Sequence, residues 1–256
     1  MPLHAFAGSF KTVPLKLYME AKTKSTNLKI VNTSEETLNL QLKSVKWTQN
    51  ENGQDNYEPT KDILFFPKML TIEKGDSQIV RVGYKGKQVI TDEQTYRLFV
   101  KELPVAKPGE QVLKMALNIG LPVFIKPAEG TIKMSLEEAK LANDMLVVKI
   151  KNSGTSHFVV SKVHATGFDA SGSESFKAEQ PGWYVLPGIS KYFSVKIPRD
   201  GCLNTSDIKI LVDMMIKDKL TDDPLKTEMK VDTALCPKEV KEEEGKDPRK
   251  RYEKKK

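Results

Sequence analysis

The chain has 256 residues, 39% of them apolar, and a formal net charge of +7. A single hydrophobic core seldom grows beyond about 250 residues, so two domains are predicted. No run approaches the roughly 18 apolar residues of a membrane-spanning helix, and membrane insertion is not expected. Residues 237–256 hold nine Lys or Arg against six Asp or Glu. This composition predicts a solvated, disordered tail rather than a nucleic-acid-binding segment.

The start of the chain carries a feature of exported proteins. Residues 5–8 read A-F-A-G, the small-x-small pattern found at the end of a signal peptide. The chain also has two cysteines, Cys202 and Cys236. An even, low number of cysteines in an exported protein allows one disulfide, and two unpaired thiols are the alternative.

Strand signals dominate the first half of the chain. Residues 36–47 alternate through three leucines and then shift to Val45 and Trp47, a change of phase that predicts a β-bulge. About seven strands separated by turn residues are typical of an immunoglobulin-like β-sandwich. Besides 36–47, the clearest of them are residues 27–32, 63–66, 78–84, 95–101 and 111–127.

The strand at 111–127 has the most regular pattern. Apolar residues occupy every second position, at Leu113, Met115, Leu117, Ile119 and Leu121. Successive side chains of a strand point to opposite faces, so these five form one stripe. The positions between them are polar or small. Such a stripe either covers the core of its own domain or is offered to another protein, and periodicity leaves both open.

The second half reads as another, smaller β-sandwich after a break at residues 127–130. One segment differs, because residues 135–138 resemble a capping box and favour a short helix through Leu141. The predicted strands are residues 145–151, 158–165, 192–197, 208–216 and 226–232. The predicted organisation is a first domain at 9–127, a second domain at 128–236 and a charged tail at 237–256.

Motifs for catalysis or metal binding are absent from the sequence. The three histidines lie outside H-x-x-x-H and H-E-x-x-H spacings, and neither C-x-x-C nor G-x-S-x-G occurs. Zinc, redox and nucleotide sites are therefore not predicted. His157 and His164 are interpreted as surface or half-buried strand residues. We expect no enzyme activity and no cofactor.

Several segments resemble the periplasmic pilus-assembly chaperones of the chaperone–usher pathway in Gram-negative bacteria. They are residues 45–57, 66–81, 93–104, 117–127, 152–154 and 182–188. The E-Q-T-Y-R-L and K-W forms are similar to the archaic branch of that family. The resemblance implies two immunoglobulin-like domains at an angle, a periplasmic location and no use of ATP.

The resemblance also implies a role for the apolar stripe. In this family the last strand of the first domain is lent to a pilin subunit that lacks one strand, by strand addition at an open edge. Counting back from the matching Lys126-Pro127, the donor residues fall on Leu113, Met115 and Leu117, continued by Ile119.

Two cations that hold the carboxylate at the end of the subunit are a further family feature. The first maps to Lys16. At the second position Pro122 stands where a lysine is usual, so Arg81 and Arg97 are both kept as replacements. The ion pairs that bridge the domains in this family map to Glu93, Lys126 and Asp213.

The leading prediction is a periplasmic chaperone that binds exported fimbrial subunits by donor-strand complementation and delivers them to an outer-membrane usher. The alternative is an extracellular structural or adhesion protein of tandem immunoglobulin-like domains. A eukaryotic protein of the major-sperm-protein type leaves the second domain unexplained. A nucleic-acid or membrane binder would act through residues 249–256. The sequence leaves open which subunit is bound and whether the free chaperone associates with itself.

Overall fold

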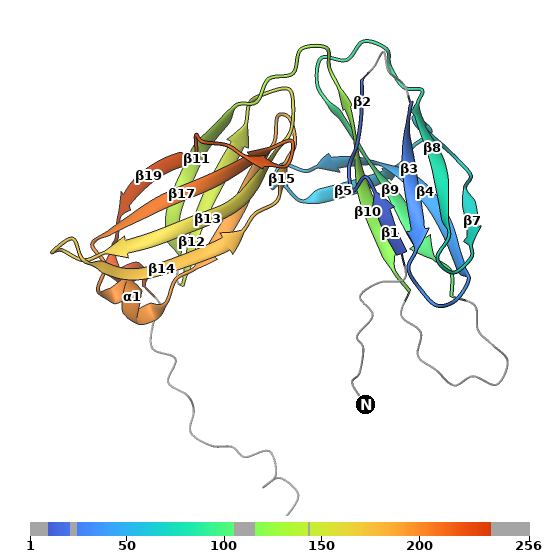
Figure 1. Ribbon diagram of the computed structural model, residues 1–256. Coiled ribbons are helices and arrows are strands. Elements are labelled where there is room, and N and C mark those ends of the chain that lie inside the picture. Colours follow the sequence, from blue (N-terminus) through green and yellow to red (C-terminus); the bar gives the residue numbers. More distant parts are fainter. Residues whose placement is uncertain (1–9, 21–24, 105–115, 143, 237–256) are drawn as a thin grey trace, which may run out of the picture.

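The computed structural model describes residues 10–20, 25–104, 116–142 and 144–236. These residues form two β-sandwiches set at an angle (Figure 1). The all-β, two-sandwich prediction is confirmed. None of the helices in these residues is long and apolar enough to cross a membrane. The predicted tail lies outside the described residues.

The first sandwich packs a four-stranded sheet, in the order β1-β3-β8-β6, against a six-stranded sheet. The larger sheet has the order β2-β10-β9-β4-β5, and β7 pairs with β4. Inward-facing side chains of both sheets form one apolar core. The strands are β1 Phe10–Val13, β2 Leu17–Glu20, β3 Ser25–Asn32, β4 Leu38–Gln49, β5 Asp55–Pro59, β6 Ile63–Phe66, β7 Met69–Ile72, β8 Ser77–Tyr84, β9 Gln94–Glu102 and β10 Asn118–Lys126.

The second sandwich packs a three-stranded sheet, β11-β12-β16, against a sheet in the order β14-β13-β17-β18. In the latter, β15 also pairs with β13, and β19 with β17. The elements are β11 Met134–Ala142, β12 Met145–Asn152, β13 Phe158–Phe168, β14 Glu174–Pro181, β15 Tyr184–Val185, β16 Ser190–Lys196, α1 Arg199–Leu203, β17 Asp207–Ile216, β18 Lys219–Leu220, β19 Leu225–Lys230 and η1 Thr233–Leu235.

The helix predicted over 135–141 is wrong, because this segment is the strand β11. It pairs with β12 along its whole length, with one register shift between Leu136 and Glu138. Met134, Leu136 and Ala139 pack against the core of the second sandwich. Sheet pairing and burial therefore outweigh the local capping signal, which is a weak preference in isolation.

The bulge predicted in β4 is also wrong. The ladder between β4 and β9 runs without a register shift from Leu40 to Lys46. Instead, the strand changes which face is buried. Leu38, Leu40 and Leu42 belong to the core of the first sandwich. Trp47, on the opposite face, belongs to a separate cluster with residues of the second domain.

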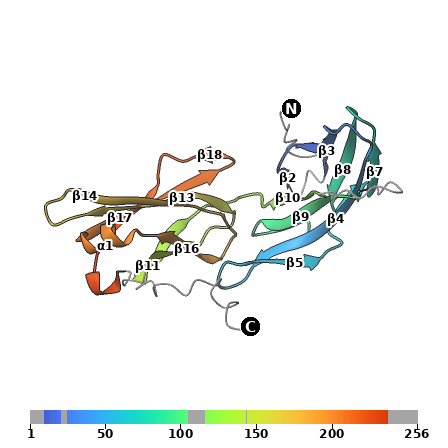
Figure 2. The ribbon, with the colours of Figure 1, turned by 90° about the horizontal axis from the view of Figure 1, so that it is seen from below.

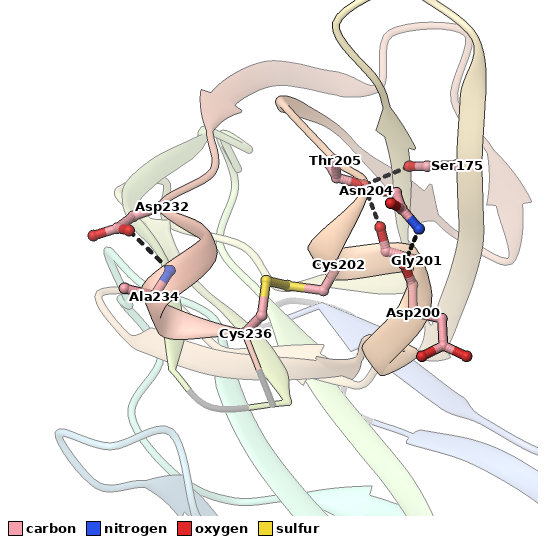
Figure 3. Close-up of a disulfide and its surroundings, with 9 residues drawn as sticks. All are labelled: Ser175, Asp200, Gly201, Cys202, Asn204, Thr205, Asp232, Ala234 and Cys236. Atoms are coloured by element: carbon pink, nitrogen blue, oxygen red, sulfur yellow. Dashed lines mark hydrogen bonds between the residues drawn. A yellow bond between two sulfur atoms is a disulfide. The ribbon is translucent and has the colours of Figure 1, made fainter. Parts of the chain in front are cut away.

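Cys202 and Cys236 form a disulfide with a Cα–Cα distance of 5.7 Å (Figure 3). It joins α1 to the segment that follows η1, across a sequence separation of 34 residues. Both cysteines are buried in the core of the second sandwich. Figure 3 also shows local bonds that fix the two ends, including the one from Ala234 N to Asp232 Oδ1 of 3.0 Å.

Replacing both cysteines with alanine is expected to lower the free energy of unfolding of the second domain by about 4 kcal/mol. The reason is that a cross-link over a loop of this length restricts the unfolded chain. Urea denaturation followed by circular dichroism measures the change, and the wild-type protein under reducing conditions serves as the control. A loss below about 1 kcal/mol would show that the loop is held mainly by its hydrogen bonds.

Candidate functional site

Strand β10 has an open edge. β9 pairs with it from Asn118 to Ile125, but β2 covers its other side only from Val123 to Lys126. β2 begins only at Leu17, opposite Val123, and the strand before it, β1, belongs to the other sheet. Among the described residues, the backbone of 118–122 therefore lacks a strand neighbour on that side. An edge of this kind can accept a strand from another chain.

Pro122 lies at the end of this open edge. The backbone of Glu102 donates to the carbonyl of Leu117 at 2.8 Å, and bonded pairs alternate along an antiparallel ladder. Pro122 and its partner Arg97 therefore form a non-bonded pair, with the proline nitrogen facing away from β9. A proline is tolerated at such a position because the ladder loses no hydrogen bond.

The apolar stripe of β10 is described only in part. Leu113 and Met115 lie outside the described residues. Leu117 and Ile119 are half-buried and pack against the core of the first sandwich, in line with the buried Leu121. These residues thus cover the core of their own domain, and a donor role for any of the four predicted residues stays a prediction.

The other face of the large sheet meets the second domain through a small aromatic core. Trp47 and Phe124 come from the first domain, and Tyr184 and Leu186 from the second. The Trp47 and Tyr184 rings meet edge to face with centroids 5.2 Å apart. All four side chains are buried, and Figure 1 shows β15, which carries Tyr184, beside the strands of the first sandwich.

Hydrogen bonds extend this boundary. The Gln49 side-chain nitrogen donates to the Tyr184 carbonyl at 2.9 Å, and its oxygen accepts from the Leu186 backbone at 3.0 Å. The indole of Trp183 donates to Asp55 Oδ2 at 3.0 Å. Each of these bonds joins β4 or β5 to the segment around β15, so the hairpin of the first domain is fixed to the second.

The tip of this hairpin needs a glycine. Gly53 has φ +71°, and a Cβ there would lie 2.8 Å from the Lys191 Cα. Lys191 donates a hydrogen bond to the Gly53 carbonyl. Both the backbone conformation and the close approach favour glycine. Figure 2 shows the hairpin of β4 and β5 reaching toward the second sandwich.

Arg97 lies buried beside the aromatic core. Its guanidinium carbon is 3.9 Å from the Trp47 ring centroid, and Nη1 donates to the Gly120 carbonyl at 3.0 Å. Among the described residues, Nε and Nη2 of Arg97 and Nε1 of Trp47 have no hydrogen-bond partner. Burial lowers the pKa of Arg97, and Tyr57 is the largest of the influences that oppose it. Buried donors that lack acceptors indicate a place for an anion or another acceptor.

Lys16 lies on the other side of Pro122. The parallel register pairs Leu17 with Val123, which sets Lys16 next to Pro122, while Arg97 is the partner of Pro122 on β9. Lys16 forms an ion pair with Asp218, and its amine lies 5.2 Å from the Tyr184 ring centroid. Burial lowers the pKa of Lys16, but the hydrogen bond to Asp218 and the nearby Tyr184 outweigh it and raise the pKa.

The two cations therefore flank Pro122, Lys16 from the residue before β2 and Arg97 from β9. Arg81, the other residue kept as a replacement, lies on β8 in the opposite sheet and is exposed. The structure thus brings Arg97, and not Arg81, together with Lys16.

The predicted interdomain ion pairs differ from what is found. Asp213 pairs with His164 at 2.8 Å, within the second sandwich. Glu93 is buried and pairs with His157. Lys126 lies over the Tyr18 ring at 4.3 Å. Burial lowers the pKa of Lys126, and the neighbouring Lys217 lowers it further.

His157 is the residue that sequence reasoning missed. It is not a strand residue, since it precedes β13. Its ring stacks on Phe124 with centroids 3.8 Å apart and an angle of 12°, and Tyr184 lies 5.6 Å away. Its only sequence signal is its place just after the N-S-G segment at 152–154. The described residues contain no group of three or more His, Cys, Asp or Glu that suits a metal ion.

Comparisons with known proteins agree with this arrangement. Residues 9–131 match the family described as pili and flagellar-assembly chaperone, PapD N-terminal domain. The chain is 23% identical over 188 residues to chaperone protein PmfD of Proteus mirabilis (strain HI4320), covering 71% of each protein.

Two solved complexes share the fold. A chain of the CsuC–CsuE chaperone–tip adhesion subunit complex of the archaic Csu pili of Acinetobacter baumannii has a TM-score of 0.59 and 19% identity, covering 86% of this chain and 98% of that one. A chain of the SafA pilin–SafB chaperone complex of Salmonella enterica has a TM-score of 0.55 and 16% identity, covering 86% of this chain and 96% of that one. The family match to the first domain and the relative that extends beyond it agree with the two sandwiches described above. The first domain of the chain, residues 9–131, belongs to the family of pilus-assembly chaperones.

Proposed function

We propose that this protein is a periplasmic chaperone that binds exported pilin subunits by strand addition and delivers them to an outer-membrane usher. The observation that carries the proposal is the open edge of β10 at residues 118–122. The last residue of this edge, Pro122, lies between Lys16 and Arg97. The likeness to the archaic Csu chaperone–subunit complex supports an archaic-type pilus as the product. A disulfide in the second domain suits an oxidising compartment such as the periplasm.

Lys16 and Arg97 are the proposed anchor for the carboxylate at the end of the subunit. Among the described residues, the Nε and Nη2 nitrogens of Arg97 have no hydrogen-bond partner, and a guanidinium can bind a carboxylate through two parallel hydrogen bonds. Lys16 adds a second positive charge on the other side of Pro122. Arg97 would thus replace the lysine that the family usually has at the position of Pro122.

The proposed donor residues are Leu113, Met115 and Leu117, with Ile119. Burying one such side chain in a subunit groove stabilises the complex by roughly 1.5–3 kcal/mol. Backbone hydrogen bonds along the open edge would set the register. Glu93 and Lys126 are proposed to help fix the angle between the domains, with His157 in place of Asp213.

Co-expression with a pilin subunit, followed by affinity capture and size-exclusion chromatography, tests the proposal. We expect a complex with one chaperone and one subunit. The matched control is the same subunit with its missing strand fused to its own chain, which should not be captured because its groove is filled. Equal capture of both subunits would contradict strand addition.

A further inference from the structure

The turn between β17 and β18 places an acidic residue of the second domain on Lys16. Lys217 and Asp218 are the two residues of this turn, between the paired Ile216 and Lys219. Asp218 forms the ion pair with Lys16. The Asp218 side chain is 57% exposed, whereas that of Lys16 is 21% exposed. The acid is thus largely accessible to solvent, and the cation that it pairs with is much less so.

The backbone of this turn is unfavourable for Lys217. Lys217 and Asp218 have φ values of 50° and 63°, and they are the only non-glycine residues with positive φ in the described part of the chain. Two-residue hairpin turns with this geometry prefer Asn-Gly, because side chains disfavour the left-handed region. Such strained positions are found where a function holds the backbone in place.

The charges around the turn act in opposite directions. Lys217 and Lys126 line the same cavity of about 420 Å³, and Lys217 contributes, after burial, to the lowered pKa of Lys126. The nearby acids Glu93 and Glu20 act to raise the pKa of Lys126. The like charge of Lys126 disfavours the position of the turn, and the pairing of Asp218 with Lys16 favours it.

We propose that Asp218 is a built-in competitor of the subunit carboxylate, covering Lys16 in the free chaperone and giving way when a subunit binds. The inference rests on the proposed function. An aspartate side chain and a chain end offer the same chemical group. Asp218 forms an ion pair with Lys16, whereas Arg97 donates to the Gly120 carbonyl and lies over the Trp47 ring. The terminal carboxylate of a subunit that contacts both Lys16 and Arg97 would therefore displace the Asp218 side chain, which contacts Lys16.

The first test measures access to Lys16 without any subunit. The protein is acetylated with N-succinimidyl acetate, and the rate at Lys16 is read by peptide mass spectrometry. D218N keeps the shape of the side chain and tolerates positive φ, so it removes only the charge. We expect about a two- to fivefold faster reaction at Lys16 in D218N. D223N, at another exposed acid of the same domain, should react like the wild type. Equal rates in all three proteins would overturn the proposal.

The second test separates a competitor from a simple tether between the domains. Wild-type chaperone and D218N compete for a limiting amount of a co-expressed pilin subunit. A competitor predicts about two- to fivefold more subunit on D218N, whereas a tether predicts less, and that result would overturn the proposal. Failure of both proteins to retain the subunit would instead count against the proposed function. In that case the acetylation rates still decide whether Asp218 covers Lys16.

Discussion

Changing Leu113, Met115 and Leu117 together to serine is expected to abolish co-purification of a pilin subunit. Three apolar side chains that each contribute about 1.5–3 kcal/mol would no longer fill the subunit groove. The affinity should fall by more than about 1,000-fold. Affinity capture after co-expression, with subunit quantified by mass spectrometry, measures the loss, and circular dichroism checks that the chaperone is folded.

The matched control changes the alternate residues of the same segment, as K114S, A116S and N118S. The alternation of the sequence predicts that these residues face the other side of the strand, so the change should leave capture unchanged. Because Leu117 also packs against the core of its own domain, the double variant L113S/M115S separates the donor role from loss of stability. Normal capture by the folded double and triple variants would refute the donor role of this strand.

Loss of Arg97 is expected to weaken subunit binding by about 10- to 150-fold, the range for hydrogen bonds to a charged group. The informative change is Arg97→Lys, which keeps the positive charge but loses the planar fork. Lys16→Ala should have a similar effect, since both cations contact the same carboxylate in our proposal. Titration of refolding subunit with each variant gives the affinities.

Two controls make this prediction specific. Arg81→Ala removes an exposed arginine on the opposite sheet and should bind the subunit as the wild type does. A subunit extended by two glycine residues moves its carboxylate away from the anchor, so it should bind the wild type weakly and be insensitive to the Arg97 change. An equal loss for both subunits would mean that Arg97 supports the fold rather than the carboxylate.

The architecture could be predicted because apolar and polar residues alternate along most strands, and this alternation can be read directly from the sequence. Two other local patterns led to wrong predictions. In β4 the change of phase reflects burial of opposite faces in two different cores, and no sequence pattern separates that from a bulge. In β11 the helix-capping signal at 135–138 was genuine but weaker than pairing with β12.

The site was harder to predict because its residues come together only through the angle between the domains. Lys16 followed from the family resemblance, and Arg97 was one of two possibilities that only the register of β9 and β10 distinguishes. His157 depends on Phe124 and Glu93, both distant in sequence. Asp213 was placed across the boundary, whereas its partner His164 lies on the adjacent strand of its own sheet.

The two faces of β4 have a consequence for the energetics of client capture. One rigid strand holds Leu40 in the first core and Trp47 in the core shared between the domains. A change of the angle between the domains would draw Trp47 away from Tyr184, which costs buried apolar contact. The backbone positions of the proposed anchor residues, Lys16 and Arg97, are thus fixed relative to each other before a subunit binds. Little conformational entropy of this part of the site is then lost on association, and more of its contact energy appears as affinity.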